Sequence, residues 1–154
     1  DLYRIVGSLV TPSPQPTVFK VPVVAPTADL VAVMMPFDTT FTRVYARLKD
    51  AASAVGLRCQ RADEIWNNHA IIDDIVELIY KARIVVSDFT GRNANVFYET
   101  GIAHTLGRDV IAITQIADDV PFDLRHLRYL EYKTSNLQSL QVALEDRMES
   151  LLIP

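Results

Sequence analysis

Two hydrophobic patterns alternate along the chain from Leu30 onward. Short continuous apolar runs predict strands that are covered on both faces, whereas apolar residues at every third or fourth position predict helices. The runs lie at 30–35, 57–60, 84–87, 110–114 and 127–132. The helical spacing covers 44–55, 71–79, 95–106 and 137–151, and a polar loop is expected at 62–68. Strands separated by helices predict an α/β fold, with a parallel sheet between two layers of helices.

The strand order of such a sheet decides where a ligand binds. We expect a flavodoxin-like, doubly wound sheet of five parallel strands with the order 2-1-3-4-5. Ligands of open α/β sheets bind beyond the carboxyl ends of the strands, where the strand order reverses. In this order the position lies between the first and third strands, and the loops 35–39 and 88–95 border it.

Residues 1–29 follow neither pattern. Five of the eight prolines fall between Pro12 and Pro26, and this spacing prevents a regular helix. We expect a proline-rich lead-in or linker at 1–29, followed by the α/β domain at 30–154. Two short apolar pieces, 2–10 and 18–24, are each a candidate for an edge strand. Because the chain begins with Asp1, we expect it to be cut from a longer protein with an upstream region.

Composition narrows the functional classes. A net charge of −4 argues against a nonspecific nucleic-acid binder, which needs a basic face. No apolar run approaches the roughly 20 residues of a membrane span, so no membrane partner is expected. The single cysteine, Cys59, excludes an internal disulfide and favours a reducing, cytoplasmic setting. A hydrophobic fraction of 49% is high for a monomer, and we therefore expect a homo-oligomer.

The densest chemistry lies at the end of the third predicted strand. The apolar run 84–87 leads into Asp88, and the polar loop after it contains Gly91. A helix then carries Glu99 in its first turns. Two carboxylates beside one strand end are typical of the place where an α/β protein holds reacting groups, since unlike environments give them different roles.

Five motifs within residues 30–132 carry a resemblance to a known family. They are Met35–Phe37, Arg61–Asp63, Ser87–Asn93, Asn95–Ala103 and Pro121–Arg125. In these motifs the chain resembles the nucleoside 2-deoxyribosyltransferase-like superfamily and its TIR-like relatives in bacterial defence systems. The resemblance implies that the domain cleaves an N-glycosidic bond, either by hydrolysis or by transfer to another base. The implied substrate is a nucleoside, a nucleotide or NAD, and no metal or other cofactor is required.

The resemblance also implies roles for individual residues. The nucleophile of the family falls on Glu99, and an acid that helps to protonate the leaving base falls on Asp88. This assignment is chemically sound, because a carboxylate near C1′ stabilises the positive charge that the sugar develops as the bond breaks. The residues expected to bind substrate are Met35, Pro36, Phe37, Asp38, Gly91, Asn93, Asn95 and Tyr98.

Each of these residues also has a structural interpretation. Glu99 is then a solvated residue that is favourable near the positive end of the helix dipole. Asp88 then caps the end of a strand, and Asn93 or Asn95 caps the following helix. Phe37 is then a core residue rather than a platform on which a base stacks.

Two further functional classes are compatible with the same fold. A non-catalytic sensor would bind a nucleotide in the pocket, with Glu99 holding the ribose hydroxyls instead of attacking the sugar. A self-assembling, TIR-like signalling domain of the bacterial defence type would associate through its helical faces. Loss of product formation in a folded Glu99→Gln variant would distinguish the enzyme from both.

Overall fold

The computed structural model describes residues 15–65 and 72–154. The strands are β1 (Leu30–Met34), β2 (Arg58–Arg61), β3 (Ile84–Asp88), β4 (Asp109–Thr114) and β5 (Tyr129–Glu131). The α-helices are α2 (Thr42–Ala54), α3 (Ala62–Ile65), α4 (Ile72–Lys81), α5 (Ala94–Thr105) and α6 (Leu137–Leu152). Three short 3₁₀ helices are η1 (Thr39–Phe41), η2 (Ala117–Asp119) and η3 (Phe122–Leu124).

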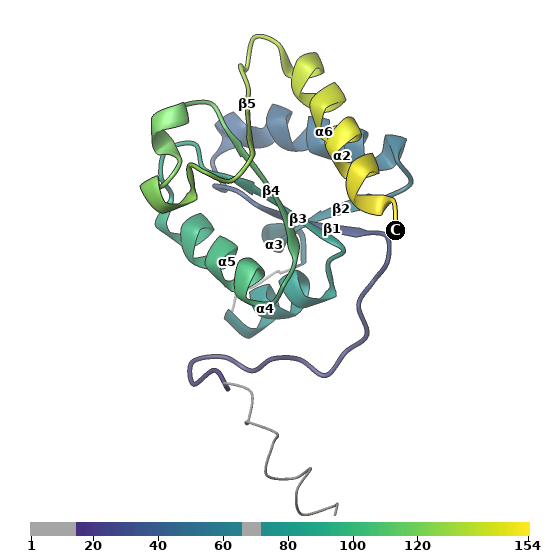
Figure 1. Ribbon diagram of the computed structural model, residues 1–154, viewed down its shortest axis with the longest axis vertical. Coiled ribbons are helices and arrows are strands. Elements are labelled where there is room, and N and C mark those ends of the chain that lie inside the picture. The colour runs from purple at the N-terminus through teal and green to yellow at the C-terminus, as the bar shows by residue number, and fades with distance from the viewer. Residues whose placement is uncertain (1–14, 66–71) are drawn as a thin grey trace, which may run out of the picture.

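The five strands form one parallel sheet with the order β2-β1-β3-β4-β5. The predicted flavodoxin-like order is therefore confirmed. Helices α2 and α6 cover one face of the sheet, and α4 and α5 cover the other (Figure 1). The reversal of strand order lies between β1 and β3, since these two strands are neighbours although β2 separates them in sequence.

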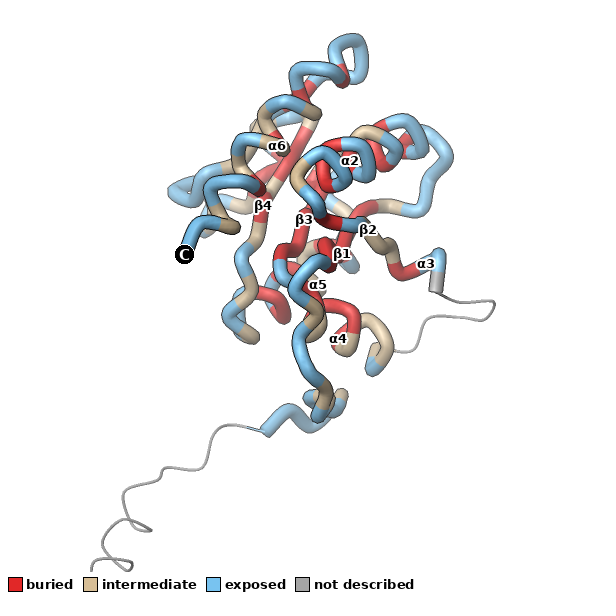
Figure 2. The backbone as a smooth tube through the Cα atoms, turned by 90° about the vertical axis from the view of Figure 1, so that its right-hand side faces the viewer, coloured by how far each residue is buried: buried red, intermediate tan, exposed pale blue. Residues whose placement is uncertain are grey.

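Two hydrophobic cores lie on either side of the sheet. Successive strand residues point to opposite faces, so Val31 and Val33 face the core under α2 and α6, whereas Leu30 and Ala32 face the core over α4 and α5. Strands β1 and β3 are buried along their whole length (Figure 2). Burial on both faces explains why their sequences show continuous apolar runs rather than alternation.

The largest departures from the predicted elements fall in the connections. The expected polar loop at 62–68 begins as the short helix α3. Two acids in its first turn, Asp63 and Glu64, stabilise this helix because negative charge is favourable near the positive end of the helix dipole. The fifth strand begins at Tyr129 rather than at 127, because the Leu127 amide donates to the Leu124 carbonyl in a turn after η3. Among the described helices, none combines the length and the apolar character that crossing a membrane requires.

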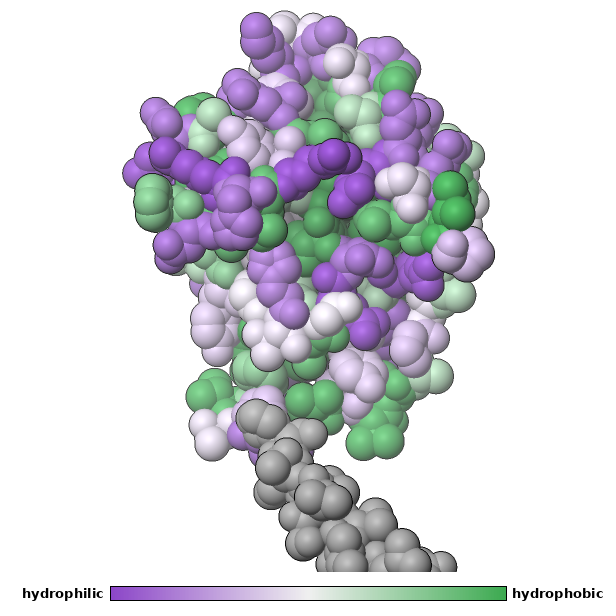
Figure 3. Space-filling view, in the orientation of Figure 1, coloured by the Kyte–Doolittle hydropathy of each residue, from purple (hydrophilic) through white to green (hydrophobic). Residues whose placement is uncertain are grey.

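The described part of the lead-in, residues 15–29, forms neither a helix nor a strand. The candidate edge strand at 18–24 is therefore wrong, and Pro22, which has no amide proton for a strand ladder, gives the reason. The candidate at 2–10 lies outside the described residues. The lead-in instead runs along α4, where the Lys20 amide donates to Asp73 (3.0 Å) and the Thr27 amide donates to the Lys81 carbonyl (2.8 Å). Hydrophobic side chains are frequent at that end of the molecule in Figure 3, and hydrophilic ones gather toward the opposite end.

Candidate functional site

A pocket of about 300 Å³ opens at the carboxyl ends of β1 and β3, where the strand order reverses. This volume is at the lower end of the range for small-molecule sites. Three segments line the pocket: the loop after β1, the first turns of α4 and the first turns of α5. The lining residues are Met35, Pro36, Phe37, Ile72, Ile75, Asn93, Asn95, Val96, Tyr98 and Glu99.

Glu99 is the acidic side chain in this lining. It lies on α5 one turn after Asn95, so the two side chains share a helix face. Within the described residues, no hydrogen-bond or ion-pair partner holds the Glu99 carboxyl group. Burial raises its pKa from the ordinary 4.5 to about 7, because withdrawal from water disfavours the ionised form. Near neutral pH, both the carboxylate and the carboxylic acid are therefore populated.

Two sets of contacts fix α5 and hence the position of Glu99. Asn93 caps the helix, since its side-chain oxygen accepts from the amides of Asn95 (3.0 Å) and Val96 (3.3 Å). A buried hydrogen bond of 2.8 Å joins the hydroxyls of Thr100 on α5 and Ser87 on β3. Of the two asparagines that the sequence offers as caps, Asn93 is the one used, and the Asn95 side chain faces the pocket.

The opposite wall consists of residues 35–37, which follow β1. Phe37 is 59% exposed, so the interpretation of this ring as a core residue is wrong. The Arg61 guanidinium lies 5.6 Å from the centre of the Phe37 ring and is held by two hydrogen bonds to Asp63, of 2.6 and 2.5 Å. Tyr98, which is 52% exposed, adds a second aromatic ring to the lining. The pocket thus presents planar apolar surfaces and two amide side chains around one carboxyl group.

Asp88 lies outside the lining of this pocket. Its side chain is fully buried, and both carboxylate oxygens are engaged. One oxygen accepts from the amide (3.0 Å) and the hydroxyl (2.6 Å) of Thr90, and the other accepts from the Tyr132 hydroxyl (2.6 Å). Burial raises the pKa of Asp88, and the hydrogen bonds from Thr90 and Tyr132 oppose this effect. In this conformation Asp88 joins the ends of β3 and β5 beneath the loop.

Asp38 and Gly91 also lie outside the lining. Asp38 caps η1 by accepting from the Thr40 amide (2.8 Å), and the Gly91 amide donates to Asp119 (2.8 Å). Conversely, Ile72, Ile75 and Val96 line the pocket although the sequence pattern assigned no site role to them. The signal for the two isoleucines is their position, because a helix that follows β2 begins at the carboxyl edge of the sheet.

The titration of Glu99 gives a first prediction. In the ligand-free protein, the ¹³C resonance of its carboxyl group is expected to titrate with a midpoint near 7. The folded state then holds a proton that the unfolded state has released, so the free energy of unfolding falls as the pH rises from about 4.5 to about 7. Glu99→Gln is expected to lose this pH dependence, and Glu149→Gln, at an exposed position of α6, is the control. A midpoint near 4.5 would contradict the burial of Glu99.

Comparisons with known proteins identify the fold. No protein-family model matches the chain, and no curated protein matches it in sequence. Among solved structures, the chain is similar to a 2-desoxyribosyltransferase from Leishmania mexicana, with a TM-score of 0.54 and 11% identity over 75% of this chain and 97% of that one. It is also similar to the TIR domain of a Toll-related receptor from Hydra magnipapillata, with a TM-score of 0.58 and 16% identity over 81% of this chain and 98% of that one. The expected resemblance to deoxyribosyltransferases and TIR domains is thereby confirmed at the level of the fold.

Proposed function

We propose that this domain cleaves the N-glycosidic bond of a nucleoside, nucleotide or NAD-type substrate, with Glu99 as the reacting carboxylate. One observation carries the proposal: a desolvated carboxyl group, without a partner among the described residues, lies in a pocket at the reversal of strand order. A carboxyl group in such surroundings costs stability, and unpaired acids of this kind are concentrated in catalytic sites. The shared fold with a protein named as a 2-desoxyribosyltransferase supports the same reaction class.

The chemistry proceeds in two steps that conserve Glu99. In the first step, the C1′–N bond breaks and its electron pair leaves with the nitrogen of the base. A base bound through a neutral nitrogen takes up a proton as it leaves, whereas the nicotinamide of NAD, bound through a cationic nitrogen, leaves as a neutral molecule without one. A carboxylate oxygen of Glu99 bonds to C1′ or stabilises the oxocarbenium charge there. In the second step, water or an acceptor base attacks C1′, and Glu99 recovers its electron pair. The attacking water or acceptor base gives up one proton, which leaves to solvent.

The pocket supplies binding groups for both halves of such a substrate. We place the base against Phe37 and Tyr98, whose exposed rings offer stacking surfaces, and the sugar hydroxyls near the amides of Asn93 and Asn95. Asp88 remains the proposed proton source for the departing base. Because both of its oxygens are engaged here, this role requires Thr90 or Tyr132 to release the carboxyl group.

The proposed function is tested by chromatography of the free base released from NAD and from a panel of nucleosides and nucleotides. Each substrate is incubated with the protein alone and with an added acceptor base. Release in water alone indicates a hydrolase, and release that needs the acceptor indicates a transferase. Binding of a panel member without any release would contradict the proposal and favour the sensor.

Phe37 gives a second prediction, since its ring is mostly exposed on the pocket wall. Phe37→Ala is expected to raise the KM of the reactive substrate roughly tenfold, because stacking on one base contributes about 1–3 kcal/mol. The free energy of unfolding should change little, as the ring is 59% exposed. Phe122→Ala is the matched control, because that ring is 84% exposed and lies in η3, outside the pocket lining. Equal KM values for the two variants would refute the stacking role.

A further inference from the structure

We propose that Asp119 is a positioning residue that fixes the start of α5 from the connection between β4 and β5. Through residues 91–93 it sets the place of the pocket groups that α5 carries. The proposal rests on the proposed function only in taking this pocket as the reactive site. Asp119 itself lies outside the pocket lining and acts through its neighbours.

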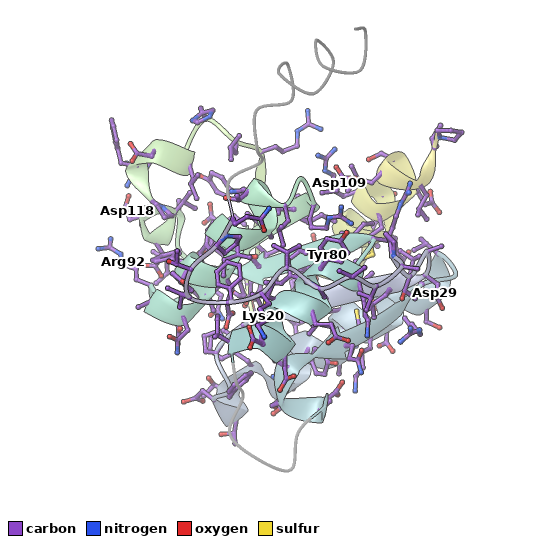
Figure 4. The ribbon with its side chains drawn as sticks, turned by 90° about the horizontal axis from the view of Figure 1, so that it is seen from below. Lys20, Asp29, Tyr80, Arg92, Asp109 and Asp118 are labelled. Carbon is purple, nitrogen blue, oxygen red and sulfur yellow. The ribbon has the colours of Figure 1, made fainter. Side chains whose placement is uncertain are left out.

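Asp119 contacts residues that are up to 28 positions away in the sequence. Its side chain is nearly buried, and one carboxylate oxygen accepts from the Gly91 amide at 2.8 Å. The other oxygen accepts from Nε of Arg92 at 3.1 Å, and a hydrogen bond between two charged groups is stronger than one between neutral groups. Arg92 also donates through Nη2 to the Asp118 carbonyl at 2.8 Å, and Figure 4 shows these two labelled residues together at the margin of the domain.

These contacts fall on two successive residues with a left-handed backbone. Gly91 has a φ of 78° and Arg92 a φ of 55°, so both lie in the left-handed region. A residue with a side chain adopts this region at a cost in free energy, and surrounding contacts must compensate for it. The chain then becomes extended at Asn93 and enters α5. The direction of entry into the helix is therefore decided at the two residues that Asp119 holds.

The support for Asp119 comes from the motif Pro121–Arg125, for which the pocket offers no role. Nε of Arg125 donates to the Val120 carbonyl at 3.3 Å, and its guanidinium lies 3.6 Å from the Asp118 carboxylate. The Val120 side chain is buried in the core that α4 and α5 share. The motif thus holds η2 in place, and η2 positions the Asp119 carboxylate next to Gly91 and Arg92.

The consequence reaches the pocket through Asn93. Its side chain accepts from the amides of Asn95 and Val96, and Glu99 lies one turn beyond Asn95. If residues 91 and 92 leave their left-handed conformation, Asn93 turns away from these amides and the first turn of α5 frays. The Asp119 contacts thereby link a connection on the far side of β4 to the reacting carboxylate.

The test uses the ligand-free protein first. In Asp119→Ala, hydrogen exchange at the Asn95 and Val96 amides, measured by NMR, is expected to accelerate at least tenfold. These amides do not touch Asp119, so their response reports the helix start rather than the deleted hydrogen bond. Asp119→Asn keeps one acceptor for the Gly91 amide and should accelerate exchange less. Asp146→Asn is the matched control, because that carboxylate lies at an exposed position of α6 and takes no part in the contacts around Asp119. Unchanged exchange in both Asp119 variants overturns the proposal.

Kinetics provide the second measurement, on whichever substrate the panel identifies. Asp119→Ala should lower kcat roughly tenfold or more and also raise KM, because Glu99 and the amides of Asn93 and Asn95 all depend on the start of α5. Asp119→Asn should recover part of the loss, and the control Asp146→Asn should match the wild type. A kcat equal to that of the wild type in folded Asp119→Ala overturns the positioning role. If the wild type releases no base, the proposed function fails, and the exchange measurement still decides the role of Asp119.

Discussion

Glu99→Gln is expected to lower the rate of base release roughly 1000-fold, which corresponds to about 4 kcal/mol of activation free energy. Glutamine has nearly the same shape as glutamate, so the pocket and the bound substrate should keep their geometry. The amide cannot form an ester with C1′ and carries no charge to oppose the oxocarbenium ion. The effect should therefore appear in kcat, with little change in KM.

The pH dependence of the wild type separates this explanation from a binding effect. Glu99 must be ionised to react, and its pKa in the free protein is about 7, so kcat/KM is expected to rise with pH and to level off above about 8. Glu99→Gln should retain the thermal stability of the wild type or exceed it at pH 8, because an ionised, desolvated group has been removed. A folded Glu99→Gln variant with more than one tenth of wild-type activity would exclude Glu99 as the nucleophile.

Asp88→Ala is expected to reduce the free energy of unfolding by about 3 kcal/mol, since it leaves three donors without an acceptor. These donors are the amide and the hydroxyl of Thr90 and the hydroxyl of Tyr132. All three lie beside a fully buried side chain, where water cannot replace the lost oxygens without a rearrangement. Urea denaturation monitored by circular dichroism measures the change.

Two further variants separate the structural role of Asp88 from its proposed role as an acid. Asp88→Asn keeps an acceptor but cannot donate a proton as an acid does, so an acid role predicts a loss of about 100-fold or more in kcat. Tyr132→Phe removes the hydrogen bonds of the Tyr132 hydroxyl with Asp88 and Gln115 and leaves the acid in place, so it should lower stability while kcat changes far less. Equal kcat values for Asp88→Asn and Tyr132→Phe would leave Asp88 with the structural role alone.

The fold could be predicted from the sequence because buried strands have continuous apolar runs that are visible locally. The continuous runs at 30–35 and 84–87 mark strands that are covered on both faces, and β1 and β3 begin where those runs begin. Helix α3 could not be predicted in this way, because its four residues are too few to show the helical spacing of apolar residues. The start of β5 could not be predicted from the apolar run either, because Leu127, although apolar, lies in a turn that is closed by its hydrogen bond to Leu124.

The candidate site was predictable where the strand order brings loops together, as for residues 35–37, and where neighbours in sequence are neighbours in space. A strand, a polar loop and a helix start place Glu99 beside the reversal of strand order, and the pocket is found there. The surroundings of Asp88 could not be foreseen, because its partner Tyr132 comes from β5's end, 44 residues away. Asn93 rather than Asn95 caps the helix because the backbone of Arg92 before it is left-handed, and an arginine in the sequence does not predict that conformation.

The contacts around Asp88 close into a ring. Asp88 bonds to Thr90, the Thr90 hydroxyl accepts from the Gln115 amide, and the Gln115 side chain donates to Tyr132, which donates back to Asp88. Residues that share hydrogen-bond partners have substitution effects that do not add. Once one member of the ring is lost, the loss of a second should cost much less. In evolution the order of changes at these positions therefore matters, and homologous sequences should show them replaced together.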